Sequence, residues 1–113
     1  MNQSSCLFCK IASGQIPSKK VFEDDRIYAF EDINPQAPTH ILLVPKKHFA
    51  DMHDGAQDPG LLGEILARSA AIASERGIRD YRLVANSGAK AGQAVFHLHF
   101  HVLGGRRMGW PPG

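Results

Sequence analysis

The sequence has no long apolar run. Over its 113 residues, no stretch approaches the roughly 20 consecutive apolar residues that a membrane-spanning helix requires. The first six residues, Met-Asn-Gln-Ser-Ser-Cys, lack the basic segment and the apolar stretch of a secretory signal peptide. We therefore expect no membrane partner and a cytoplasmic location.

The sequence also has little excess of charge of either sign and few cysteines. The formal net charge is +2, and basic residues occur in short pairs such as Lys46-Lys47 rather than in a long stripe. Nucleic acid is therefore not expected as a partner. The two cysteines, Cys6 and Cys9, would be reduced in the cytoplasm and should not form a structural disulfide. The glycine-rich loops of dinucleotide-binding proteins and P-loop ATPases are absent.

What remains is the composition of an ordinary globular protein, with 43% apolar and 21% charged residues. We expect residues 1–113 to form a single domain. A helix beginning after the N-cap Asp58 keeps helical spacing of apolar residues up to Arg76. Residues 6–13 suggest a short N-terminal helix. Strands are predicted at residues 20–23, 26–31, 40–44, 81–86 and 97–102, which together indicate an α+β fold with an antiparallel sheet.

The segment His97-Leu98-His99-Phe100-His101 carries the strongest functional signal. In a strand, alternate side chains point to opposite faces, so the three imidazoles would share one face. Imidazole is a nucleophile, a general acid or base, or a metal ligand near neutral pH. Two interpretations stay open: a metal site built from several histidines, and direct nucleophilic attack by one of them.

Cys6 and Cys9 have the Cys-x-x-Cys spacing. Three interpretations compete for them: half of a zinc site, a redox pair, or two small buried residues. A zinc site needs two further ligands from elsewhere in the chain.

The segment His97-Leu98-His99-Phe100-His101-Val102 resembles the His-x-His-x-His-x motif of the histidine-triad (HIT) superfamily. Residues 33–40 resemble the loop and strand of that family's nucleoside pocket, and Asn86, Gly92 and Gln93 match its phosphate-side positions. Gly104-Gly105 and the ending Trp110-Pro111-Pro112-Gly113 resemble the Hint branch, the purine nucleoside phosphoramidate hydrolases.

This resemblance implies a fold and an activity. The fold is a five-stranded antiparallel sheet with one long helix and a short N-terminal helix, and a homodimer joins two sheets into ten continuous strands. The activity is hydrolysis of a P–N bond in purine nucleoside phosphoramidates, through a nucleotidyl-histidine intermediate and without a catalytic cofactor. One alternative is a nucleotide-binding interaction protein with weak hydrolase activity. Another is a metal hydrolase that uses all three histidines.

The resemblance also assigns roles to residues. His99 would be the nucleophile, with His97 and His101 beside it at the phosphate and His40 assisting. The residues expected to bind the nucleotide are Phe8, Ile11, Ile16, Phe30, Asp32, Ile33, Asn86, Gly92, Gln93, Ala94, His99 and His101. A structural zinc would be held by Cys6, Cys9, His48 and His97, with unmetallated cysteines as the alternative. Ala94 departs from the serine of close Hint relatives, which puts rate and leaving-group preference in question.

Overall fold

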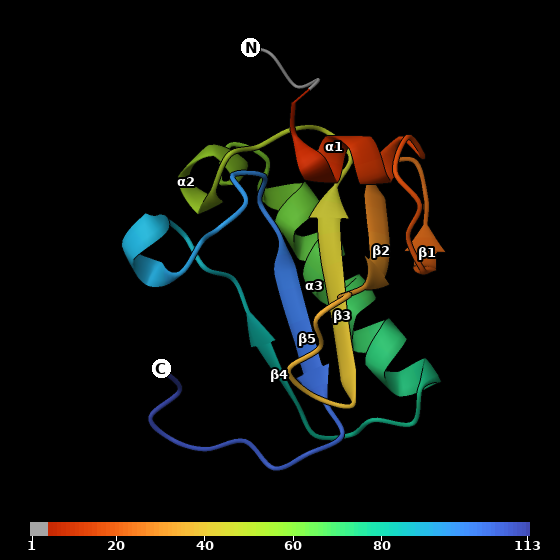
Figure 1. Ribbon diagram of the computed structural model, residues 1–113, viewed down its shortest axis with the longest axis vertical. Coiled ribbons are helices and arrows are strands. Elements are labelled where there is room, and N and C mark those ends of the chain that lie inside the picture. Colours follow the sequence, from red (N-terminus) through yellow and green to blue (C-terminus); the bar gives the residue numbers. More distant parts are fainter. Residues whose placement is uncertain (1–4) are drawn as a thin grey trace.

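The computed structural model describes residues 5–113 and is built around one five-stranded antiparallel sheet (Figure 1). The strands are β1 (Lys20–Glu23), β2 (Ile27–Glu31), β3 (Thr39–Pro45), β4 (Tyr81–Val84) and β5 (Phe100–Gly104). They lie in the order β1-β2-β3-β5-β4. The histidine-rich segment therefore leads into a strand next to the centre of the sheet, flanked by β3 and β4.

The long helix α3 (Pro59–Glu75) packs on one face of the sheet, behind it in the view of Figure 1. Its start matches the prediction, because the Asp58 side chain accepts a hydrogen bond from the backbone N–H of Leu61 and Pro59 takes the first turn. Its fully buried apolar residues Leu61, Ile65 and Ile72 recur at helical spacing. Each such side chain contributes about 1.5–3 kcal/mol when it is removed from water.

The two sheet faces carry separate apolar clusters. On the side of α3, Ile27, Ala29, Ile41 and Leu43 pack against the helix together with residues from β5. On the opposite side, a second cluster lies beneath the short helix α1 (Leu7–Ala12), which crosses the ends of β2 and β3. That cluster contains Phe8, Ile11, Tyr28, Phe30, Leu42 and Val44. Alternation along β2 and β3 thus divides the side chains between the two clusters, as the pleat requires.

Two short elements were not predicted. The four-residue helix α2 (Met52–Gly55) begins at Asp51, whose side chain caps the backbone N–H of Asp54. It places Gly55 against Leu98, where a Cβ on the glycine would lie 2.6 Å from the Leu98 Cδ2 atom. The 3₁₀ turn η1 (Ala89–Ala91) lies in the loop before the histidine segment. Both elements are too short to leave a periodic pattern in the sequence.

The prediction that His97 and His99 lie in a strand is wrong, because β5 begins at Phe100. The last pair of the β3–β5 ladder is Leu43 with Phe100. The backbone N–H of Leu98 donates to the Phe49 carbonyl instead, at 2.7 Å. Alternation nevertheless persists, since Leu98, Phe100 and Val102 all join the cluster under α3. The strand predicted over 81–86 ends earlier, at Val84.

None of the helices in the described residues is long and apolar enough to cross a membrane.

Candidate functional site

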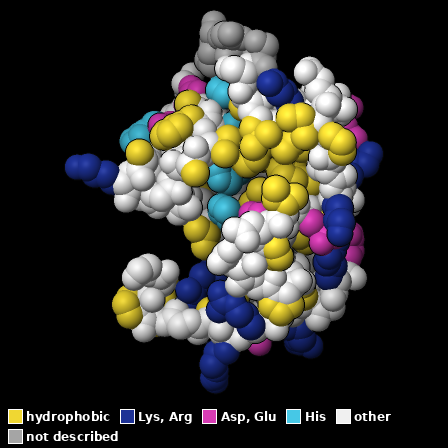
Figure 2. All heavy atoms as spheres, viewed as in Figure 1, with side chains coloured by type: hydrophobic (Ala, Val, Ile, Leu, Met, Phe, Trp, Pro, Cys, Tyr) yellow, Lys and Arg dark blue, Asp and Glu magenta, His cyan; other side chains and the backbone are white. Residues whose placement is uncertain are grey.

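A cavity of about 380 Å³ opens on the sheet face beneath α1. Figure 2 shows histidine side chains along one side of an apolar patch on this face. Ile33 forms part of the rim and is 99% exposed, so the cavity is open to solvent on that side. The residues expected to bind a nucleotide that line it are Phe8, Ile11, Ile16, Phe30, Asp32, Ile33, Asn86, Gly92, Ala94, His99 and His101.

The orientation of His99 is fixed by the backbone. Its Nδ1 lies 2.8 Å from the carbonyl oxygen of His97, and since a carbonyl only accepts, Nδ1 carries the hydrogen. In the neutral ring, Nε2 therefore keeps its lone pair. Phe8 packs edge-on against the ring with centroids 5.0 Å apart, which further restricts its rotation. His99 is thus a buried imidazole with an available nitrogen beside a cavity.

His101 is oriented by a chain of hydrogen bonds that begins outside the cavity. The backbone N–H of Gln36 donates to Nδ1 of His40 at 3.0 Å, so the neutral His40 ring carries its hydrogen on Nε2. That Nε2–H lies 2.9 Å from Nδ1 of His101 and donates to it. His101 must then carry its own hydrogen on Nε2. This atom is buried and has no hydrogen-bond partner among the described residues.

Burial is the main influence on the protonation of these rings. It lowers the pKa of His99 and His40, and it lowers that of His101 to about 4, assisted by the neighbouring His99 and His40. The Asp32 carboxylate, whose Oδ2 lies 3.4 Å from His40 Nε2, opposes the shift in all three pKa values. At neutral pH the rings are therefore uncharged, and the hydrogen positions derived above apply.

His97 points away from the cavity and does not line it. Its ring is fully buried, and Nε2 donates to the carbonyl of Pro45 at 2.7 Å. Its Nδ1 lone pair faces the Sγ atoms of Cys6 and Cys9, at 3.3 and 3.5 Å. Nδ1 of His48 lies 3.4 Å from the Cys9 Sγ. Burial lowers the pKa of His97 to about 4, which keeps its nitrogen available as a ligand.

The two cysteines and two histidines fit a tetrahedral metal site. Their ligand atoms all lie within 4.8 Å of one another, and two thiols with two imidazoles are a donor set typical of structural zinc. Without metal, burial and the neighbouring Cys6 raise the pKa of Cys9 to about 11. A bound cation would favour the Cys9 thiolate and so counteract the rise in its pKa. The zinc ligands expected from the sequence therefore lie together.

The triad does not form a common ligand set. His97 faces the cysteines, His99 bonds to a backbone carbonyl, and His101 bonds to His40. This geometry does not favour the interpretation of a catalytic metal held by all three histidines.

The Gln93 side chain stabilises the loop that contains Gly88 and Gly92, and it does not line the cavity. It is 3% exposed, and its Oε1 accepts from the backbone N–H of Gly88 at 2.8 Å. Its Nε2 donates to the carbonyls of Ala50 and Val95. The neighbouring Ala94 does line the cavity, as does Gly92, which has a φ of +99° that favours glycine.

Sequence reasoning missed several residues that line the cavity. Leu7, Pro17, Ser18, Glu31, Leu42 and Val95 also contribute to the wall. Leu42 could have been identified from strand alternation, since it shares a face with His40 and Val44. Ser18 lies between α1 and β1, in a segment without periodicity that offered no signal.

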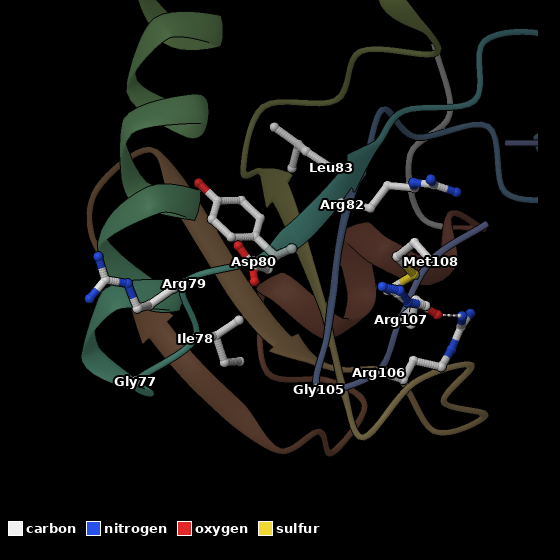
Figure 3. A pocket seen from close by; sticks show the side chains of 11 residues that line it. Gly77, Ile78, Arg79, Asp80, Arg82, Leu83, Gly105, Arg106, Arg107 and Met108 are labelled. Carbon is white, nitrogen blue, oxygen red and sulfur yellow. Dashed lines mark hydrogen bonds between the residues drawn. The ribbon is translucent and has the colours of Figure 1, made fainter. Parts of the chain in front are cut away.

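A larger cavity, of about 950 Å³, lies between β4 with the turn before it and the C-terminal segment (Figure 3). Leu83 and Arg82 of β4 form one wall, and Arg106, Arg107 and Met108 of the C-terminal segment form another. Arg82 donates to the Gly109 carbonyl at 2.7 Å, which ties the two walls together. Within residues 5–113 its lining contains no histidine or cysteine, so the smaller cavity is the better candidate for a reaction.

Comparison with known proteins places the chain among close relatives. The sequence model of the HIT domain matches residues 13–108. An uncharacterized HIT-like protein of Synechocystis is 50% identical over 109 residues, covering 95% of this chain and 96% of that protein. A 14 kDa zinc-binding protein of Zea mays is 43% identical over 122 residues, covering 100% of this chain and 91% of the relative.

A solved structure of a HIT family hydrolase from Legionella pneumophila superposes with a TM-score of 0.93 at 54% identity. The match covers 96% of this chain and 100% of that chain. The α+β architecture expected from the sequence, with five antiparallel strands, one long helix and a short N-terminal helix, is therefore confirmed.

Proposed function

The chain belongs to the HIT domain family, and on that premise we propose that it is a Hint-type hydrolase of purine nucleoside phosphoramidates. The observation that carries the proposal is the hydrogen bond from His99 Nδ1 to the His97 carbonyl, which leaves Nε2 as a nucleophile beside an apolar cavity. We further propose that residues 1–113 form one HIT domain.

The first chemical step is attack by His99 Nε2 on the phosphorus of the substrate. A bond forms between Nε2 and phosphorus, the bond from phosphorus to the amine nitrogen breaks, and its electron pair leaves with the nitrogen. The nucleotidyl-imidazolium carries a positive charge and is a good leaving group. Water then attacks phosphorus, loses a proton, and releases the nucleoside monophosphate and neutral His99.

The departing nitrogen needs a hydrogen-bond donor, and His101 is the group best placed to supply one. Among the described residues its buried Nε2–H has no partner, and the ring lies beside His99, with ring centroids 5.0 Å apart. Burial keeps this ring neutral. The neutral Nε2–H can donate a hydrogen bond to the departing nitrogen, which takes up its proton from solvent as it leaves. His40 acts as a positioning residue, because its Nε2–H holds His101 in the tautomer that carries its hydrogen on Nε2.

The remainder of the cavity suits a nucleoside. Phe8, Ile11 and Phe30 offer an apolar slot for a planar base, and Asp32 supplies a carboxylate for the ribose hydroxyls. The backbone of the glycine-containing loop near Gly92 approaches the phosphate without a side chain in the way.

We also propose that Cys6, Cys9, His48 and His97 hold a structural zinc. These four residues would supply a complete ligand set, so the zinc would act structurally and cross-link the N-terminal helix to the chain near β3 and β5. The name of the Zea mays relative, a zinc-binding protein, supports this assignment.

The homodimer implied by the resemblance would form through β4. The outer strands of the sheet are β1 and β4. The exposed ends of β1 carry the charged residues Lys20 and Glu23, which discourage strand addition, whereas β4 exposes Tyr81 and Leu83. A second copy paired along β4 would extend the sheet to ten strands and cover the cavity of Figure 3. Sedimentation of the wild type against Leu83→Lys tests this, with a shift to monomer expected.

The decisive experiment traps the intermediate. Adenosine phosphoramidate is mixed with enzyme, the reaction is quenched, and intact mass and peptide mapping locate a nucleotidyl group. His99→Ala should lose the label while AMP still binds, because the apolar slot and Asp32 remain. His101→Ala should form the label more slowly. A label that persists in His99→Ala, or that maps to another histidine, would overturn the proposal.

The rival interpretation, a nucleotide-binding interaction protein with weak activity, predicts a different outcome. AMP would bind, but adenosine phosphoramidate would release AMP no faster in wild type than in His99→Ala. Ala94 is the observation that favours this rival, since the cavity lacks a hydroxyl at that position.

A further inference from the structure

The apolar slot contains one polar pair that none of the chemistry above uses. Ser18 lines the cavity, and its hydroxyl lies 2.7 Å from the phenolic oxygen of Tyr28. Tyr28 is 7% exposed and belongs to the apolar cluster beneath α1. A part-buried polar pair at the wall of an apolar cavity can offer a hydrogen bond to a ligand bound there.

The sheet order places Ser18 at the end of the cavity opposite the histidines. Ser18 precedes β1 by two residues, and β1 lies three strands away from β5, which follows His99. Three strand spacings amount to roughly 14 Å. A nucleotide with its phosphate at His99 therefore directs its base toward Ser18. In a purine, the edge farthest from the sugar carries N1 and the substituent at C6.

The position of Ser18 is well defined. The backbone N–H groups of Gln15 and Ile16 both donate to the Lys10 carbonyl, at 2.9 and 3.2 Å. On its other side, the Lys19 carbonyl accepts from the backbone N–H of Glu31 at 3.0 Å. The segment is thus tied both to α1 and to β2, and the serine side chain is held at the cavity wall.

The hydrogen-bond direction within the pair follows from acidity. Either hydroxyl can donate in this pair, and because a phenol is the better hydrogen-bond donor we take Tyr28 to donate to Ser18 Oγ. The hydrogen of Ser18 is then available to the cavity. The remaining polar lining residues, apart from Glu31, are Asp32, Asn86, His99 and His101, which serve the ribose and phosphate. The Glu31 carboxylate lies 3.7 Å from Arg76 on the α3 side.

We infer that Ser18, positioned by Tyr28, determines base specificity by donating a hydrogen bond to an acceptor on the distal edge of a bound purine. The inference rests on the proposed function, because it requires the base to occupy this slot. Adenine N1 and guanine O6 are such acceptors. A pyrimidine is one ring shorter and would leave the hydroxyl unpartnered, so the pair favours purines.

Calorimetric binding of AMP and of 1-deaza-AMP, in which N1 is replaced by C–H, tests this without requiring turnover. The wild type should bind 1-deaza-AMP about 2- to 12-fold more weakly than AMP, the range expected for one net hydrogen bond. Ser18→Ala should bind both ligands equally. Tyr28→Phe keeps the aromatic ring and should reduce the discrimination, a change in ligand preference that a purely structural role of the phenol would not produce.

Ser13→Ala is the matched control, because Ser13 is an exposed serine whose hydroxyl donates to the Lys10 carbonyl and does not line the cavity of the described residues. It should keep the wild-type ratio. Equal binding of the two ligands by the wild type, or unchanged discrimination in Ser18→Ala, would overturn the inference while leaving the proposed function intact. Failure of the wild type to bind any nucleotide would overturn both.

Discussion

Nε2 of His40 lies 2.9 Å from Nδ1 of His101, and this contact fixes the hydrogen of His101 on the nitrogen that faces the candidate site. His40 and His99 are buried and His101 is half-buried, and burial lowers the pKa of each ring. The arrangement is stable only while the rings are neutral, since charging any of them introduces repulsion inside the protein.

Acid should therefore destabilise the fold through His101. Its pKa is about 4 in the folded chain and about 6.5 in an unfolded one. The unfolded state binds the extra proton between these values, so this contribution to stability is complete above pH 6.5 and is lost as the pH falls toward 4. Urea unfolding at a series of pH values should show that the unfolding free energy of His101→Gln depends less steeply on pH than that of the wild type. The difference should correspond to at most one proton taken up on unfolding. An identical dependence in the variant would contradict the assignment.

The reaction should tolerate mild acid. Because burial lowers the pKa of His99, its Nε2 lone pair persists below pH 6.5, where an ordinary histidine is already protonated. We expect kcat/KM for adenosine phosphoramidate to fall only below that pH. A profile that declines with a midpoint at or above 6.5 would show that the nucleophile is more solvated than its buried position indicates.

Zinc should stabilise the N-terminal helix. Cys9→Ala removes one of four ligands, so the purified variant should contain less zinc and have a lower melting temperature than the metal-loaded wild type. Chelation should lower the wild-type melting temperature to near that of the variant. Elemental analysis and thermal unfolding measure both effects. Full zinc content in Cys9→Ala would contradict the ligand set.

Gln93 should matter for stability. Its replacement by alanine leaves the Gly88 N–H and the carbonyls of Ala50 and Val95 without their side-chain partner. We expect Gln93→Ala to cost at least about 2 kcal/mol of unfolding free energy, measured by denaturant titration. Gln57→Ala, at an exposed position, is the control and should change stability by less than about 0.5 kcal/mol. Equal losses of unfolding free energy in the two variants would show that the hydrogen bonds of the Gln93 amide do not contribute to stability.

A hydroxyl at position 94 should increase turnover. Ala94 lines the cavity, and a serine there would add a hydrogen bond near the departing nitrogen, worth about 0.5–1.5 kcal/mol. Ala94→Ser should therefore raise kcat for substrates with basic amines and leave AMP affinity nearly unchanged. The control is Ala91→Ser, at an exposed position in η1. Flat or reduced turnover would mean that another group already fills this role.

The sequence predicted the elements whose signals are local. Asp58 and Pro59 mark the start of α3, and the continuous apolar run predicted β3 because both of its faces are buried. The end of the β3–β5 ladder at the Leu43–Phe100 pair was not predicted, because strand alternation does not tell which backbone groups find partners across the sheet. Gln93 was expected to bind the nucleotide, but its side chain points into the protein. The sequence could not show this, because all three of its hydrogen-bond partners are backbone atoms.

The candidate site was predicted through resemblance more than through periodicity. The cluster of Cys6, Cys9, His48 and His97 joins residues up to 91 positions apart, and spacing alone cannot bring such residues together. The protonation pattern was also inaccessible from the sequence, because it depends on the carbonyls of Pro45 and His97 and on the N–H of Gln36.

The group that orients His99 is part of the main chain, so no substitution at position 97 can delete it. The side chain of that residue faces the cysteines, while its carbonyl faces the nucleophile. The residues of the metal cluster can therefore be substituted without changing the orientation of the His99 ring, provided that the local backbone conformation is kept. Relatives without cysteines at positions 6 and 9 could keep the same geometry at the reacting histidine.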